Sequence, residues 1–440
     1  MKTAAPPQGK HGAKEVFMVE MYPRVFKSGL KQTLYIKLSE DIRTDSLEIK
    51  LQPMEKYSIP HTPALRIDEN GRYPFVPMTA CGDGVYSFEY DFLGEQQYTV
   101  RVASAGEVIY TSCVYALDED LAALQAFKGD LHLHSCRSDG VGTPFEVACD
   151  YRAAGYDFIA LTDHHKFAPS QEAQAAVKEK TDAFYVFRGE EVHNKSMGMI
   201  HIINFNGESS VNDIIETDDE YVNAEIDRIM AERDLSALSD PRCVAYRIFI
   251  AEHIRKAKGL AILAHPFWPY GEYHMQTEET VYHLKNGDFD AFEVLAGCDE
   301  VGHGNNLQEM LYFDLVAEGY RTPVVGSSDA HFRAADGPFT LVHKQFTLVF
   351  AKDFDEIPDA IRDFRSVAVE RQSEKKFHVI GSFRYVKYAR YLMQYFYPTY
   401  ATLCAAHASA MASGTPDEIK SAEAAIAEYK TRFFAKTTEA

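Results

Sequence analysis

The chain has 440 residues, a formal net charge of −20 at pH 7, 46% hydrophobic residues and 25% charged residues. This length and composition predict a globular protein of two or three domains. The acidic charge argues against a nucleic-acid partner, because such binding depends on neutralising phosphates with Lys and Arg.

The first part of the chain predicts an all-β domain. After a flexible N-terminus over residues 1–13, apolar or alternating segments such as TLYIKL and QYTVRVA recur through residues 14–120, separated by turn-like pieces such as DENGRYP. Short strands at this spacing are typical of an antiparallel sandwich. The segment carries no titratable cluster, so we interpret it as an accessory domain.

The pattern changes after Lys128. GDLHLH predicts a strand, a capping box at Thr143 opens a helix that stops at Gly155, and YDFIALT predicts the next strand. The alternation continues through LAILA, FDAFEVL and TPVVGSS to FTLVF, with an acidic helical excursion over 207–240 and a helical tail. It predicts an α/β fold with a parallel sheet or barrel, whose functional residues lie at the C-terminal ends of the strands.

The predicted strand ends are rich in metal-binding side chains. Twelve of the 17 histidines lie between Gly129 and His331. In GDLHLHSCRSDG, His132 and His134 point to the same face of a strand, about 7 Å apart. A lone histidine such as His201 is more often a core residue, and an Asp after a strand is more often a helix cap. Neither explanation accounts for strand after strand ending in His, Asp or Glu.

Four motifs, DLHLHSCRSDG, ALTDHH, LAILAHP and GSSDAH, resemble in this order the PHP (polymerase and histidinol phosphatase) superfamily. The resemblance covers residues 128–375 and implies a distorted (β/α)7 barrel, followed by a helical extension over 376–440. It implies two or three divalent ions at the mouth of the barrel, and the mixed N/O donors suit Zn, Mn or Fe. The implied ligands are His132, His134, Asp139, His164, Glu191, His201, His265, Asp329 and His331.

The resemblance also implies the chemistry of the site. Bound metals lower the pKa of water to about 7 and clamp the attacking and leaving oxygens of a displacement. Glu191 bridges two ions, with Glu190 as the neighbouring alternative, and Asp329 is both ligand and proton acceptor. Together with His331, these residues are the implied catalytic groups. The implied reaction is hydrolysis of a small phosphorylated metabolite, and the oligomeric state stays open.

Several cations and histidines near the predicted mouth are candidates for binding the substrate. Arg333 is the first choice, because an arginine fork matches phosphate oxygens better than a lysine does. The alternative for each of them is an ordinary surface or loop residue. The other candidates are Arg137, Lys166, His165 and His303.

Other functions compete with this interpretation. A β-rich region ahead of GDLHLHS also resembles carbaryl-hydrolase-like metallohydrolases, which cleave carbamate, ester or amide-type bonds. A non-catalytic, metal-stabilised binding protein is a further alternative, whereas a polymerase accessory role has little support in an acidic chain. The seven cysteines never fall as C-x-x-C, and no run of 18 apolar residues occurs. We therefore expect reduced thiols, a cytoplasmic location and no membrane partner.

Overall fold

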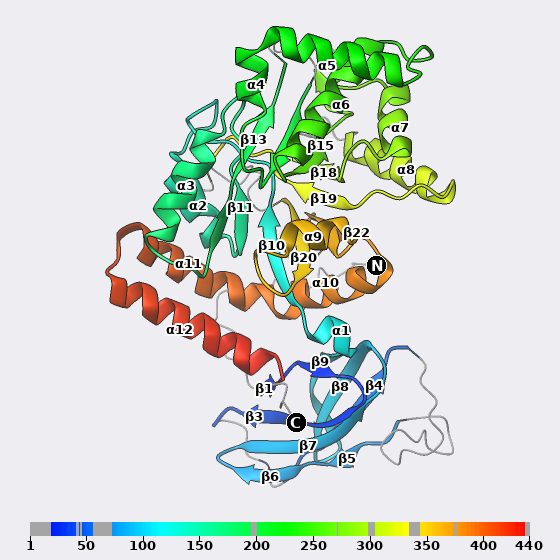
Figure 1. The fold of residues 1–440 in the computed structure, drawn as a ribbon. Helices are drawn as coiled ribbons and strands as arrows, with labels where there is room; N and C mark the ends of the chain where they lie inside the picture. The colour runs from blue at the N-terminus through cyan, green and yellow to red at the C-terminus, as the bar shows by residue number, and fades with distance from the viewer. Residues whose placement is uncertain are drawn as a thin grey trace, which may run out of the picture. The chain divides into compact units, whose positions relative to one another are not determined.

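The computed structural model describes residues 19–40, 44, 46–55, 73–194, 200–270, 272–297, 304–333, 344–373 and 376–435. The chain forms two compact units (Figure 1). One consists of Met1–Ala122 with Lys430–Ala440, and the other of Ala123–Tyr429. The N-terminal segment 1–13 lies outside the described residues, so its predicted flexibility stays a prediction.

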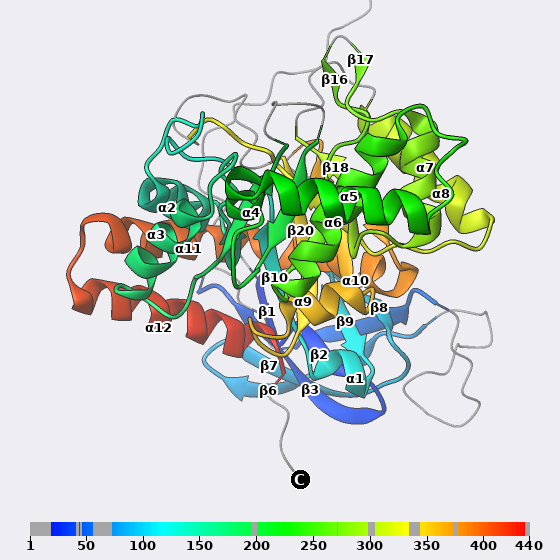
Figure 2. The same ribbon diagram turned by 45° about the horizontal axis from the view of Figure 1, so that its top comes forward.

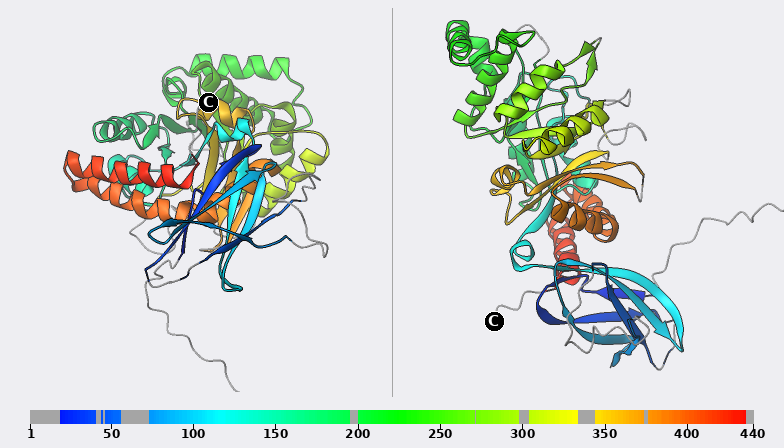
Figure 3. Two further views of the ribbon diagram at one scale, coloured as in Figure 1. Left: turned by 90° about the horizontal axis from the view of Figure 1, so that it is seen from below. Right: turned by 90° about the vertical axis from the view of Figure 1, so that its right-hand side faces the viewer.

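The first unit consists of two β-sheets with a shared core, drawn from blue to cyan in Figure 3. The sheets have the strand orders β1-β3-β7-β6 and β2-β9-β8-β4-β5, and all pairs are antiparallel except β2 with β9. Alternating apolar side chains from both sheets, such as Leu34 and Tyr98, pack into one core, which is the reason for the sandwich-like pattern. The elements are β1 (Val19–Tyr22), β2 (Val25–Lys27), β3 (Leu30–Leu38), β4 (Glu48–Pro53), β5 (Val76–Pro77), β6 (Thr79–Gly82), β7 (Val85–Phe92), β8 (Gln96–Ser104), β9 (Glu107–Leu117) and α1 (Glu119–Ala122).

The second unit is a mixed α/β structure with two main sheets. Their strand orders are β12-β11-β10-β20-β21-β22 and β13-β14-β15-β18-β19. The strands of the six-stranded sheet are β10 (Gln125–Asp130), β11 (Phe158–Ala160), β12 (Tyr185–Phe187), β20 (Gln345–Ala351), β21 (Ser366–Arg371) and β22 (Phe377–Gly381). Those of the five-stranded sheet are β13 (Gly189–Val192), β14 (Ile202–Phe205), β15 (Leu260–Leu263), β18 (Ala291–Ala296) and β19 (Val324–Ser327).

The expectation of a parallel sheet is only partly correct. The pairs β10–β11, β11–β12, β15–β18 and β18–β19 are parallel, whereas the other pairs in these two sheets are antiparallel. Residues 193–201 between β13 and β14 are too few for a parallel crossover, which needs about a dozen residues or more. Between the described strands, pairing gives two sheets and not one closed barrel.

Helices cover both sheets of the second unit. Figure 1 shows α2 beside β11 and α6 beside β15, α3 packs against β12, and Figure 2 shows these three helices from a second direction. The capping box predicted at Thr143 is confirmed, with Pro144 at the first helical position. Over the described ranges, no helix combines the length and apolarity of a membrane span. The helices are α2 (Pro144–Ala153), α3 (Ala168–Lys178), α4 (Asn212–Thr217), α5 (Asp219–Glu232), α6 (Pro241–Lys256), α7 (Thr277–Asn286), α8 (Gly304–Ala317), α9 (Ile357–Arg362), α10 (Phe383–Tyr395), α11 (Tyr397–Ser413) and α12 (Pro416–Phe433), and β16 (Pro269–Tyr270) with β17 (Glu272–Tyr273) forms a small hairpin.

Both main sheets contribute to one apolar core. Phe158 of β11, Ile203 of β14 and Val325 of β19 belong to the same cluster, and each is almost fully buried. Burying such side chains is the dominant favourable term in folding, so the core holds the two sheets together. As a result, the ends of strands from different sheets meet at one edge of the unit.

The buried Lys128 of β10 is expected to make the stability of the protein depend on pH. Burial lowers the pKa of Lys128 to about 7, and its ammonium donates to the carbonyl of Ala154 at 3.0 Å. In the unfolded chain the side chain keeps its proton up to about pH 10.4. Between pH 7 and 10 the unfolded state therefore binds more protons, and the free energy of unfolding rises with pH. We expect Lys128→Met to lose up to about 1.4 kcal/mol of this rise per pH unit.

Urea unfolding of the wild type and Lys128→Met at pH 7, 8, 9 and 10 measures this difference. If the free energies of unfolding of the two proteins change with pH by the same amount over the whole range, Lys128 keeps an ordinary pKa in the folded protein.

Candidate metal centre

The first and last motifs lie side by side at the strand ends. β10 ends at Asp130, so His132 and His134 follow the strand instead of lying inside it. The amide of Asp329 donates to the carbonyl of His132 at 2.9 Å, and the amide of His134 donates to that of Ala330 at 3.0 Å. These backbone bonds continue the strand pairing beyond the sheets and bring two distant segments of the chain together.

Glu191 of β13 lies at the centre of the histidine cluster. Its side chain is fully buried, and neither carboxylate oxygen has a hydrogen-bond partner in the described structure. A buried carboxylate without hydrogen bonds is costly unless a cation compensates its charge. Imidazole nitrogens lie 2.6–3.7 Å from its oxygens, and they belong to His132, His134, His164, His193, His201 and His265.

The adjacent Glu190 has a different environment. Its carboxylate accepts hydrogen bonds from Asn204, Ser210, Val211 and Asn212, at 2.6–3.0 Å. Successive residues of a strand face opposite sides, so only one of the two glutamates can point at the histidines. That residue is Glu191, and Glu190 is already satisfied by protein donors.

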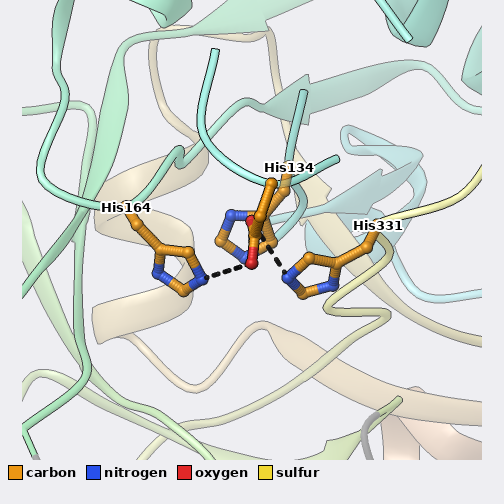
Figure 4. A group of neighbouring side chains, drawn as sticks. His134, His164 and His331 are labelled. Carbon is orange, nitrogen blue, oxygen red and sulfur yellow. Dashed lines mark ion pairs between the residues drawn. The ribbon is translucent and has the colours of Figure 1, made fainter. Parts of the chain in front are cut away.

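A second group of ligand atoms gathers around Asp139. Figure 4 shows His134, His164 and His331 turned toward a common space. The nitrogens of His164 and His331 lie 3.5 and 3.4 Å from the two carboxylate oxygens of Asp139. Ligand atoms of one tetrahedral ion lie about 3.4 Å apart when the bonds are near 2.05 Å. These separations therefore suit a shared ion.

Eight of the nine predicted ligands fall into groups that could hold a metal, with ligand atoms within 4.8 Å of one another. The groups are His134–Asp139–His164–His331, His132–His134–Asp329, His132–Glu191–His265 and His164–Glu191–His193. The ninth, His201, contacts Glu191 at 2.7 Å without entering a group. The donor set of imidazoles and carboxylates, together with the orphaned oxygens of Glu191, therefore fits divalent metal ions.

Sequence reasoning missed two residues of this site. The Nε2 atom of His193 lies 2.8 Å from the Nδ1 atom of His164, and Glu293 contacts the Nδ1 atom of His132 at 3.2 Å. Glu293 also accepts from the amide of His265, so it orients the neighbouring rings. Its signal was the single carboxylate within the apolar strand AFEVLA of residues 291–296.

The backbone is strained at two predicted ligands. His265 and Asp329 have backbone φ angles of 22° and 48°, and residues other than glycine rarely adopt positive φ angles. Such conformations cost on the order of 1–3 kcal/mol and persist where the surroundings impose them, often at functional sites. Here they turn the chain sharply where the strands β15 and β19 end.

Only part of the cluster is held in charge states that suit metal binding, because burial is outweighed at His132, His265 and His331 by nearby carboxylates, which raise the pKa of these three imidazoles. Burial lowers the pKa of His134 to about 3 and that of His201 to about 4, so both imidazoles are neutral at pH 7. Burial opposes ionisation of Asp329, but the surrounding histidines hold the pKa of this carboxyl well below its ordinary value. Burial also opposes the charged form of His164, yet Glu191 and Asp139 raise its pKa to about 10. An incoming ion would displace the proton of His164.

Three of the predicted substrate-binding residues line one cavity. Arg137, His165 and Lys166 border a space of about 400 Å³, together with Phe167 and other residues of α3. The Arg137 guanidinium forms a double hydrogen bond to Glu172, at 2.7 and 2.9 Å, on the same wall. The lining residues His165–Pro169 directly follow His164 in the sequence, so one wall of the cavity begins beside a predicted metal ligand.

Arg333 is not among the residues that line this cavity. The guanidinium of Arg333 binds Asp150 at 2.8 and 3.1 Å and Glu146 at 2.9 Å, so α2 already occupies its fork. Contact between Arg333 and a substrate stays a prediction. His303 lies outside the described residues.

Replacing Asp163, which is not a predicted ligand, is expected to have a large indirect effect on metal binding. It is fully buried and accepts from the amides and hydroxyls of Ser135 and Ser138, at 2.6–3.0 Å. These bonds fix the loop that carries Asp139. We expect Asp163→Asn to weaken metal binding about 10–100-fold, as changes around ligands do. Metal titration of the folded variant measures this change in metal affinity. If the affinity is unchanged while the melting temperature falls, Asp163 contributes only to the stability of the fold.

Comparison with known proteins gives partial matches. No family model matches the chain. A curated relative, a 5′-3′ exoribonuclease of Haemophilus influenzae, is 39% identical over 80 residues, which is 18% of this chain. The chain thus covers only 28% of that relative's length.

Three solved structures are similar in fold. A two-domain protein from Bacteroides vulgatus containing a PHP-like metal-dependent phosphoesterase is 18% identical, with a TM-score of 0.38, over 56% of this chain and 65% of that chain. A metal-dependent phosphoesterase from Bifidobacterium adolescentis is 18% identical over 48% and 89% of the two chains, with a TM-score of 0.32. An amidohydrolase from Chromobacterium violaceum, with bound sulfate and no metal, is 20% identical over 48% and 90%, with a TM-score of 0.33.

Proposed function

We propose that this chain is a PHP-superfamily metallohydrolase, and that it hydrolyses a small phosphorylated metabolite with two or three bound divalent ions. The observation that carries the proposal is the arrangement around Glu191 and Asp139, where ligand atoms from five strand ends converge. The distorted (β/α)7 barrel, the identity of the ions as Zn, Mn or Fe, and a cytoplasmic location are also parts of this proposal.

The chain's own residues have defined tasks in this scheme. When bound, the ions lower the pKa of water and polarise a phosphoryl oxygen. The carboxylate of Glu191 is shared between neighbouring ligand groups, and Asp329 lies 3.0 Å from His134 and 3.2 Å from His132. We assign Asp329 the double task of ligand and proton acceptor. His331 holds its ring beside Asp139 and completes the group at the outer side of the cluster.

The cavity beside the cluster supports a phosphorylated substrate. A volume of about 400 Å³ is within the range of small-molecule sites, about 300–1,000 Å³. Lys166 and Arg137 are the cations of this cavity, although the guanidinium of Arg137 also binds Glu172, and Phe167 offers an apolar wall for the rest of the molecule. We therefore assign substrate binding to this cavity and place His165 at its boundary with the ligands.

Cleavage of a carbamate, ester or amide bond is the second candidate. The same metal chemistry can attack a carbonyl carbon, and the apolar part of the cavity, with Phe167, Ala168 and Pro169, favours a neutral group. A phosphodiester at an RNA end, suggested by the name of the curated relative, is a third substrate class for the test. A non-catalytic binding protein would lose stability but no activity when its metal is removed.

Phosphate release tests the proposal. The Mn- and Zn-reconstituted protein is assayed with a panel of phosphomonoesters, a 5′-phosphorylated oligoribonucleotide, and carbamate and ester substrates, with Asp329→Asn as the control. We expect release from phosphomonoesters that disappears in the variant. If the protein hydrolyses only substrates of another class, the assignment moves to that class. If it binds metal but hydrolyses none of the substrates, the non-catalytic alternative is favoured.

A further inference from the structure

Glu293 is a carboxylate inside a strand that is otherwise apolar. It lies in β18, with the sequence AFEVLA, where every residue is buried, and its own exposure is 0%. A carboxylate loses its hydration when it is buried, so an apolar side chain would serve packing better at this position. Packing of the core therefore does not explain why the strand carries Glu293.

The two oxygens of Glu293 contact two different motifs. Oε1 lies 3.2 Å from Nδ1 of His132 in the first motif, and Oε2 accepts from the amide of His265 in the third motif at 3.1 Å. These two histidines form one candidate ligand group together with Glu191. Glu293 itself belongs to none of the groups. It therefore contacts two ligands of a single ion site without being one of that site's ligands.

The contact with Glu293 decides which nitrogen of His132 can bind a metal. An ionised carboxylate only accepts hydrogen bonds, so the nitrogen that faces it, Nδ1, carries a hydrogen. The other nitrogen, Nε2, is buried and has no hydrogen-bond partner among the described residues. It lies 3.2 Å from Asp329 and 3.5 Å from Glu191, which are both predicted ligands. The contact thus directs Nε2 toward the ion site.

The backbone around Glu293 has an irregularity that fixes the direction of this side chain. The register between β18 and β19 shifts between Glu293 and Leu295, so a bulge follows Glu293 directly. Bulges change the direction of a side chain and are frequent beside active sites. The buried amide of Gln308 on α8 donates to the carbonyls of Glu293 and Val294, both at 3.1 Å. These bonds hold the bulge from outside the metal cluster.

We propose that Glu293 is a positioning residue for one particular ion, the one that His132, Glu191 and His265 would hold. Its carboxylate fixes the ring of His132 with Nε2 toward the ion, and it fixes the backbone turn that carries His265. The inference rests on the proposed function only in taking the cluster as a metal site.

The effect of Glu293 should be confined to this ion. In the described part of the chain, Glu293 forms neither a hydrogen bond nor an ion pair with any member of the outer group, which consists of His134, Asp139, His164 and His331. Replacing Glu293 should therefore weaken the ion at His132 and leave the ion at Asp139 bound. General damage to the fold would release both ions together, so this selectivity separates a positioning role from a structural one.

Cobalt binding to the full-length chain tests this selectivity. The apo-proteins of wild type, Glu293→Gln and Asp139→Asn are titrated with Co²⁺ and followed by visible absorption and elemental analysis. A glutamine has a single acceptor oxygen, so it cannot accept from both His132 and the amide of His265. We expect Glu293→Gln to bind one ion about 10–100-fold more weakly, and Asp139→Asn to weaken a different ion. Wild-type affinities in Glu293→Gln, or loss of the same ion in both variants, would overturn the inference.

Asp288→Asn is the matched control for Glu293→Gln. The carboxylate of Asp288 contacts Nδ1 of His283 at 2.9 Å, and the two side chains are 2% and 0% exposed. The variant therefore changes the same kind of buried contact outside the candidate ligand groups. It should keep the cobalt affinities of the wild type. If it weakens the same ion as Glu293→Gln, general destabilisation accounts for the effect and the inference is wrong.

Glu293→Asp provides a second variant if Glu293→Gln does not fold. Aspartate keeps both acceptor oxygens but is shorter by one methylene, so its carboxylate is withdrawn from the ring of His132. We expect the same ion to bind more weakly than in the wild type, and unchanged cobalt affinities would contradict the inference. A wild type that binds its ions but hydrolyses no substrate would refute the proposed function, whereas the selective loss of one ion would still support the role of Glu293.

Discussion

Glu191→Gln is expected to lower the rate of phosphate release by more than about 100-fold. This loss exceeds the roughly 10–100-fold effect that is typical when a residue bonded to a metal ligand is replaced. The carboxylate lies within 3.7 Å of imidazole nitrogens of six histidines, and no group among the described residues donates a hydrogen bond to it. A neutral amide cannot supply the negative charge that two ions share. The number of ions retained after gel filtration should therefore fall together with the activity.

Glu190→Gln is the matched control for this change, since Glu190 is the preceding residue of β13 and is equally buried. An amide presents donors to the groups that now donate to Glu190, so we expect a loss of about 1–3 kcal/mol in the free energy of unfolding. The folded fraction should keep its ions and its turnover. Loss of metal from Glu190→Gln and not from Glu191→Gln would reverse the assignment of the two glutamates.

Arg247→Met is expected to lower the free energy of unfolding by about 3–5 kcal/mol. Arg247 of α6 and Glu279 of α7 form an ion pair at 2.7 Å, and their side chains are only 2% and 4% exposed. Removing the cation leaves a carboxylate buried without its partner. Thermal unfolding should show a midpoint lowered by roughly 5–15 °C.

The same helix supplies the control for this variant. Arg242 pairs with Asp227 at the same distance of 2.7 Å, but the two side chains are 49% and 68% exposed. Arg242→Met should cost less than about 1 kcal/mol, because water screens an exposed pair. Adding Glu279→Gln to Arg247→Met should restore part of the stability; equal effects of the two arginine variants would contradict the dominant role of burial.

The individual elements were predictable from the sequence because they depend on local patterns. Alternation predicted the strands of the first unit, and the capping box at Thr143 predicted the start of α2. Strand pairing between distant segments leaves no such pattern. The division into two sheets and the antiparallel pairs around β14 therefore could not be derived.

The motifs likewise predicted which residues gather, but not how each one reaches the cluster. His201 was expected at a strand end, whereas it precedes β14; because β14 is antiparallel to β13 and β15, its beginning lies at the edge where its neighbour β15 ends. The choice of Glu191 over Glu190 required the face of the strand to be known. His193 and Glu293 stand outside the four motifs, so only their position in space indicates a role.

The backbone bonds between residues 132–134 and 328–330 also determine when the centre can form during synthesis. A nascent chain carries the two histidines of the first motif about 200 residues before Asp329 and His331 are made. Until those last residues have left the ribosome, the two ligand groups that contain Asp329 or His331 cannot form, and neither can the backbone pairing that shapes them. Metal loading of these two groups must therefore follow translation of about two thirds of the second unit, and a chain that ends before Asp329 would expose the histidines of the first motif without completing either group.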